Sequence, residues 1–169
     1  SPHYVDKVYT YGTPHDGIDL LGVNAPDLGR LDVLQVANFN RERMREYLRL
    51  PEKKSGPVNT LDGAFPSERF FCFVGSNHRD YVVGAAKRAT GPMSDGLVMM
   101  GNAYVDGAPR AVAYRSHSGP YGIVNSESGY QNLQRFLFGQ LRVTATLQVD
   151  ALPLSKAIQD KKDQGAKVR

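Results

Sequence analysis

His117 and Asp95 are the residues of this chain best suited by type to acid–base chemistry. His117 follows directly on the apolar run 111–114 and lies in a loop of serine and glycine. An imidazole titrates near neutral pH, and a carboxylate on its other ring nitrogen fixes the tautomer that can accept a proton. Asp95, in the upstream loop 94–98, can supply that carboxylate. The spacing alone fits equally well a histidine that caps a turn beside a turn aspartate.

Other patterns that carry chemistry are weaker. No two glycines are separated by a single residue, which excludes the dinucleotide fingerprint, and no P-loop lysine follows a glycine pair. The four histidines lie in separate loops without a cysteine pair or a His-Glu-x-x-His motif, so we expect no metal site. We interpret His15 as a turn residue that satisfies loop backbone groups, and His78, near Asp80, in the same way. Asp80 competes with Asp95 for the role of the acid, but we interpret it as the cap of a following helix or as a partner of Arg79.

Three short apolar runs predict strands that would position these residues. They are Val8–Tyr11, Phe70–Val74 and Ala111–Tyr114, each followed within a few residues by Gly, Pro, Ser or Asn. Such runs are typical of strands buried on both faces of a parallel sheet. With helical segments between them they predict an α/β fold, in which functional loops follow the carboxyl ends of the strands.

Two segments predict helices. Asn40 is a suitable N-cap for residues 41–50, which carry an apolar face and stop at Pro51. Asn125 or Ser126 can cap a second helix that ends at Gly139. This second helix is expected to pack on the sheet.

The last part of the chain differs from the rest. From Leu141 to Asp150, apolar and polar side chains alternate, which predicts a strand with one wet face, at a sheet edge or at the start of a further β domain. Residues 155–169 are charged and have few large apolar groups, so they predict a loop or mobile end. We therefore divide the chain into residues 1–140 and 141–169.

Three loops together resemble the α/β-hydrolase family of lipases and related esterases. The sequence Gly12-Thr13-Pro14-His15-Asp16-Gly17, after a strand, resembles the Gly-Thr-Pro-His-x-Gly loop of these acyl hydrolases. Ser94-Asp95-Gly96-Leu97-Val98 resembles the loop of their catalytic acid, and His117 matches the position of their histidine. The motifs occur in the family's order over residues 5–139.

This resemblance implies a fold and a set of roles. Residues 1–140 would form the carboxyl-terminal half of an α/β-hydrolase domain, a mostly parallel sheet with flanking helices, and residues 22–66 would hold a cap or lid. Asp95 would be the acid and His117 the base. The turn Gly12, Thr13, Pro14 and His15 would contribute to substrate binding.

The family's nucleophile has no counterpart in this chain. It stands in a Gly-x-Ser-x-Gly turn, and no serine here has glycine at both flanking positions. Ser94 comes nearest, with Gly96 after it but Pro92 before it. Because the family's order is serine, acid, histidine, we expect the serine to precede Ser1, in the other half of the same domain.

Composition excludes several broader classes. With 169 residues, 41% hydrophobic and 22% charged, the chain suits one packed domain. Its net charge of +4 comes partly from the last stretch, and no basic stripe interleaved with aromatics indicates nucleic-acid binding. No apolar run approaches the roughly 18 residues of a membrane span, and no secretory leader is recognised. The single cysteine, Cys72, favours a packing role and a reducing compartment, although many exported domains also lack disulfides.

The function that the resemblance to α/β-hydrolases implies is ester hydrolysis through an acyl-enzyme, on an ester or lipid substrate and without a cofactor. The alternative is a noncatalytic α/β-hydrolase-like module that binds a partner or ligand. An intact nucleophile turn upstream in the parent gene would favour the enzyme.

Overall fold

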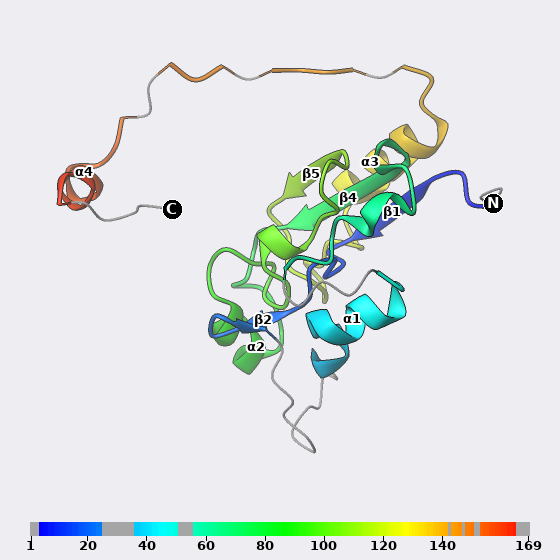
Figure 1. Ribbon diagram of the computed structural model, residues 1–169. Helices are drawn as coiled ribbons and strands as arrows, with labels where there is room; N and C mark the ends of the chain where they lie inside the picture. The colour runs from blue at the N-terminus through cyan, green and yellow to red at the C-terminus, as the bar shows by residue number, and fades with distance from the viewer. Residues whose placement is uncertain are drawn as a thin grey trace. The chain divides into compact units, whose positions relative to one another are not determined.

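The structure, a computed structural model, describes residues 4–24, 36–50, 56–141, 143–146, 148–150 and 153–164. It divides into two units, Ser1–Gly139 and Gln140–Arg169. The first unit is mixed α/β and contains the predicted parallel sheet (Figure 1). Its strands are fewer than a complete α/β-hydrolase sheet needs, so the structure shows the fold class and not the full family fold.

Three parallel strands form the sheet: β1 (Val8–Tyr11), β4 (Phe70–Gly75) and β5 (Arg110–Ala113), in the order β1-β4-β5. All three predicted strands are therefore confirmed within one residue at either end. Only the central β4 is buried nearly throughout; β1 is half-buried, and β5 alternates between exposed and half-buried residues. The expected burial on both faces is confirmed for β4, which carries Phe70, Cys72 and Val74 in the core on one face and Phe71 against Phe136 on the other.

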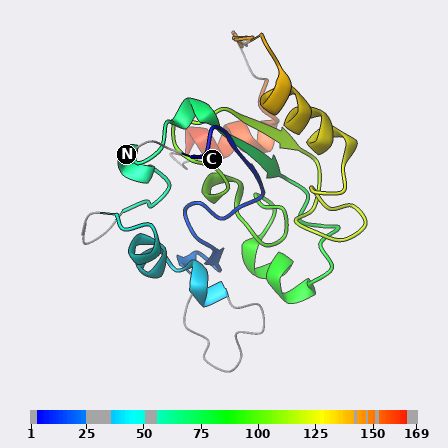
Figure 2. The ribbon, with the colours of Figure 1, turned by 90° about the vertical axis from the view of Figure 1, so that its right-hand side faces the viewer.

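The two faces of the sheet pack against different layers (Figure 2). On one face, the ring of Phe71 stacks on Tyr9 and lies 5.4 Å from Phe136 of α3 (Glu127–Phe138). On the other face, Phe70, Cys72 and Val74 join a core with residues from the loops, among them Ile18, Val36, Val98 and Val105. The sheet is thus packed between α3 on one face and the loop core on the other.

The helices begin at the predicted caps. In α1 (Arg41–Tyr47), the Asn40 side chain accepts a hydrogen bond from the amide of Glu42, and in α3 Ser126 accepts one from Gly129. A further helix, α2 (Gly84–Thr90), begins four residues after Asp80. The prediction that Asp80 caps it is wrong, because its N-cap is Val83 and no side chain caps it. Among the described helices, none is both long and apolar enough to cross a membrane.

Short elements complete the first unit. The strands β2 (Asp19–Leu20) and β3 (Val23–Asn24) pair antiparallel, and the 3-10 turns are η2 (Val36–Phe39), η3 (Leu61–Gly63), η4 (Ser67–Arg69) and η5 (Met100–Asn102).

The region expected to be a cap is partly described. Within residues 22–66, Val36 and Val58 are buried, and the first residue of α1, Arg41, forms ion pairs of 3.1 Å with both Asp16 and Asp19. Parts of this segment thus belong to the packed unit, whereas α1 itself buries no residue. A lid role for the segment stays a prediction.

The predicted strand Leu141–Asp150 is wrong for the residues that the structure describes there. Residues 141, 143–146 and 148–150 form no strand, and Leu141 and Val143 are 89% and 85% exposed. Alternation alone does not make a strand, because its backbone groups need a paired strand. The predicted loop beyond it is also corrected, since α4 (Lys156–Asp163) forms there, with a Gln159–Asp163 hydrogen bond one turn apart.

Candidate active site

Asp95 and His117 are hydrogen-bonded to each other. Nδ1 of His117 lies 2.9 Å from Oδ2 of Asp95, and the two residues are 22 positions apart in the chain. The contact that the sequence predicted is therefore present. The catalytic roles of the two residues stay predictions.

The carboxylate of Asp95 is almost completely enclosed. Its side chain is 1% exposed, and its second oxygen, Oδ1, accepts hydrogen bonds from the amides of Leu97 (3.0 Å) and Val98 (2.8 Å). A buried carboxylate is stable only where such donors replace water. With both oxygens occupied, the carboxylate has one orientation, and it faces the imidazole.

The loop of Asp95 is closed by its own hydrogen bonds. The amide of Asp95 donates to the carbonyl of Val98, and the hydroxyl of Ser94 accepts from the amide of Gly96 and lies 2.6 Å from the carbonyl oxygen of Gly91. Ser94 itself is fully buried. This serine is thus a loop-closing residue, and its hydroxyl is not available as a nucleophile.

Backbone hydrogen bonds also hold the loop of His117 in place. The amide of His117 donates to the carbonyl of Asp95 at 2.8 Å. The amide of the neighbouring Ser116 donates to the carbonyl of Tyr121, and its carbonyl accepts from the amide of Ile123. The His117 side chain is 24% exposed. In the described part of the chain, no hydroxyl or thiol is hydrogen-bonded to its other nitrogen, Nε2.

This geometry determines what the pair can do. The Asp95 carboxylate accepts the hydrogen on Nδ1, so the neutral imidazole carries its lone pair on Nε2. That atom is on the partly exposed side chain and can take a proton from an approaching hydroxyl. The carboxylate then stabilises the imidazolium that forms.

Gly12, which follows β1, lies against both members of the pair. A Cβ atom at residue 12 would be 2.8 Å from Oδ2 of Asp95 and 3.3 Å from Nδ1 of His117. Gly75, at the end of β4, is equally tight, because a Cβ atom there would be 2.7 Å from that of Asp95. The strand ends thus bring glycine backbone, not side chains, up to the carboxylate.

The rest of the Gly12–His15 turn faces elsewhere. Pro14 is buried and Thr13 half-buried, while Nε2 of His15 is 3.0 Å from the hydroxyl of Thr10 and its ring lies edge-on to Phe70. Burial lowers the pKa of His15 to about 4, so this histidine is neutral at pH 7. His15 therefore stabilises the fold locally; a substrate contact by this turn stays a prediction.

The competing acid, Asp80, is not bonded to His117. Its carboxylate accepts a 2.6 Å hydrogen bond from the side chain of Asn77, which is itself buried and bonded through its backbone to Arg115. Asp80 thus belongs to the turn after β4.

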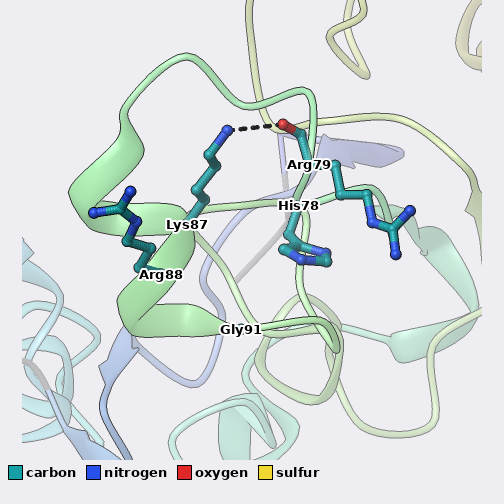
Figure 3. Close-up of a pocket in the computed structure, with 5 residues that line it drawn as sticks. All are labelled: His78, Arg79, Lys87, Arg88 and Gly91. Carbon is teal, nitrogen blue, oxygen red and sulfur yellow. Dashed lines mark hydrogen bonds between the residues drawn. The ribbon is translucent and has the colours of Figure 1, made fainter.

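His78 lines a shallow hollow of about 300 Å³ with Arg79, Lys87, Arg88 and Gly91. Lys87 donates to the backbone carbonyl of Arg79, and the side chains of Arg79 and Arg88 point to opposite sides (Figure 3). Basic side chains therefore surround the hollow, but they do not point toward a common position where a ligand could bind. Among the described residues, no cluster of His, Cys, Asp and Glu could hold a metal ion.

Sequence reasoning missed Tyr81 and the amides of Leu97 and Val98. Tyr81 lies next to His117, with ring centroids 5.9 Å apart. The two amides could not be found from residue types, because every residue carries a backbone amide. No signal near Tyr81 in the sequence indicates its contact with His117, 36 positions further along the chain.

Comparison with known proteins does not connect this site to a family. No protein-family model, curated protein or solved structure matches the chain. The likeness to α/β-hydrolases therefore rests on the three loops themselves.

Proposed function

We propose that this chain supplies the acid and the base of a serine hydrolase that cleaves carboxylic esters through an acyl-enzyme. The observation that carries the proposal is the His117–Asp95 hydrogen bond of 2.9 Å, made by a carboxylate that is 1% exposed. Among the described residues, no hydroxyl or thiol is bonded to Nε2 of the imidazole. A turn histidine beside a turn aspartate would not need so complete an enclosure of the carboxylate.

In this mechanism, Nε2 of His117 removes the proton from a serine hydroxyl while the serine oxygen attacks the ester carbonyl. The proton passes to the leaving alcohol, and an acyl-enzyme remains. A water molecule then attacks the acyl carbon while His117 takes its proton. The acyl–serine bond breaks, His117 returns the proton to the serine oxygen, and the carboxylic acid is released. Asp95 keeps the ring oriented and stabilises its charged form.

The serine comes from outside residues 1–169, in the other half of the same domain. Among the described strands, β1 is paired along one edge only, with β4. Gly12, directly after β1, touches both Asp95 and His117. A further parallel strand on the open edge of β1 would end beside the imidazole, which supports this edge as the attachment of that half.

The test uses the full-length product of the gene that encodes this chain. A fluorophosphonate probe should label one serine outside residues 1–169, and His117→Ala should slow labelling and ester turnover by a factor on the order of 10³ or more. His78→Ala is the matched control and should leave both unchanged. The proposal is wrong if no serine is labelled, or if labelling is indifferent to His117.

The second candidate is a noncatalytic binding module. It is favoured by two observations: no described hydroxyl is hydrogen-bonded to His117, and Ser94 is buried with its hydroxyl bonded within its own loop. Both candidates predict that residues 1–169 alone do not hydrolyse a short-chain aryl ester. Turnover by this chain that is lost in Ser94→Ala would overturn both and make Ser94 the nucleophile.

A further inference from the structure

Tyr81 is an aromatic residue buried in a segment that is otherwise exposed. Its side chain is 5% exposed, whereas Asp80 before it is exposed and Val82 after it is 68% exposed. A large ring in a loop is buried to this extent only when it fills a specific space between other elements. For Tyr81, that space lies between the loop of Asp95 and the loop of His117.

On the side of the acid, Tyr81 packs on the backbone of Gly96. A Cβ atom at residue 96 would lie 2.2 Å from Cβ and 2.7 Å from Cγ of Tyr81, so no side chain fits there. Gly96 also has a φ of +102°, a conformation that favours glycine. Tyr81 therefore covers Gly96, the residue that directly follows Asp95.

On the side of the base, Tyr81 contacts the imidazole. The rings of Tyr81 and His117 have centroids 5.9 Å apart and planes at 88°, which is the favoured edge-to-face geometry. The pKa of Tyr81 is raised, first by burial and then by the negative charge of Asp95, while a hydrogen bond with Ser118 acts in the opposite direction. The hydroxyl is consequently neutral at pH 7 and adds no charge beside the pair.

We infer that Tyr81 is the positioning residue of His117: its ring sets the plane of the imidazole and excludes water from the Asp95–His117 hydrogen bond. The inference rests on the proposed function for its catalytic meaning. The two contacts that support it, from Tyr81 to Gly96 and from Tyr81 to His117, lie within this chain and do not depend on whether the protein is an enzyme. Without the Tyr81 ring, the imidazole would lose the aromatic contact on one side and could rotate away from Asp95.

The experiment observes the hydrogen on Nδ1 of His117 directly. In the full-length product of the gene that encodes this chain, labelled with ¹⁵N-histidine, this hydrogen should give a low-field NMR signal that exchanges slowly with water. Tyr81→Phe keeps the ring and should retain the signal. Tyr81→Leu should speed its exchange about tenfold or more, because the hydrogen bond is no longer shielded. Tyr121→Leu, which removes an exposed ring from the loop of His117, is the control and should resemble the wild type.

The inference is overturned if folded Tyr81→Leu keeps the slowly exchanging signal, or if Tyr121→Leu loses it to the same extent. If Tyr81→Leu does not fold, Tyr81→Met, which fills more of the space, answers the same question with the same criterion. In the full-length protein, Tyr81→Leu should lower kcat more than it raises KM. A positive NMR result without any serine labelling would refute the proposed function and leave the positioning role intact.

Discussion

Gly12 and Asp95 are in direct contact across 83 positions of sequence: a Cβ atom at residue 12 would lie 2.8 Å from Oδ2 of Asp95. Gly12 is also in the left-handed region, with a φ of +54°. The first residue of the Gly-Thr-Pro-His turn thus has a structural reason to be glycine, since any side chain would push on the carboxylate that holds His117.

Gly12→Ala is therefore expected to break the Asp95–His117 hydrogen bond. The Nδ1 hydrogen signal of His117 should disappear, and ester turnover by the full-length protein should fall at least tenfold. Gly22→Ala is the matched control, because Gly22 has a φ of +78° but nothing within 4 Å of the added Cβ. It should cost about 1 kcal/mol of stability from backbone strain alone and leave the signal in place. Equal effects of the two substitutions would contradict the contact.

Asp95→Asn should separate the two candidate acids. An asparagine keeps the shape but removes the charge that orients Nδ1–H, so turnover by the full-length protein should fall roughly 10²- to 10³-fold, somewhat less than for His117→Ala. Asp80→Asn alters only the bond to Asn77 and should have the smaller effect. If Asp80→Asn abolishes activity and Asp95→Asn does not, Asp80 is the acid and the role of Asp95 is wrong.

His15 should make the fold sensitive to acid. Its pKa is lowered from 6.5 to about 4 by burial, so the unfolded chain binds a proton more readily between these values. Stability is then fully present above pH 6.5 and decreases as the pH falls toward 4, by about 3 kcal/mol for a shift of this size.

The measurement for His15 is urea unfolding at pH 7.0 and 4.5. His15→Gln removes the titrating ring and should reduce the loss of stability between these two values, whereas the control His78→Gln should not. A loss that is the same in the wild type and in His15→Gln would show that other groups cause the acid sensitivity.

Cys72 should be unreactive in the folded protein. Its side chain is 0% exposed, burial raises the pKa of its thiol, and the amide of Val105 donates to its sulfur at 3.3 Å. Iodoacetamide at pH 8 should modify it on the order of 10³ times more slowly than in urea, since alkylation requires opening of the core. Modification in native buffer at the rate of a free thiol would contradict the packing of β4.

Local sequence was sufficient for the elements that local interactions create. Short apolar runs predicted β1, β4 and β5, and the caps Asn40 and Ser126 marked the starts of α1 and α3, because a strand pattern or a helix cap involves residues only a few positions apart. The same reasoning failed at Leu141–Asp150, where the alternation was real but the described residues have no strand to pair with. It also misplaced the cap of α2 at Asp80, whereas the helix begins at Gly84 without a capping side chain.

The sequence by itself determined which residues could form an acid–base pair and in what order they occur, since residue type, order and neighbouring turn residues are properties of the chain. Only the tertiary structure decided that Asp95 is hydrogen-bonded to His117 and that the amides of Leu97 and Val98 solvate the buried carboxylate. It also decided that Gly12 and Tyr81 pack against this pair. The physical reason is distance along the chain. These contacts join segments brought together by parallel strand pairing and core packing, so no short stretch of sequence contains them.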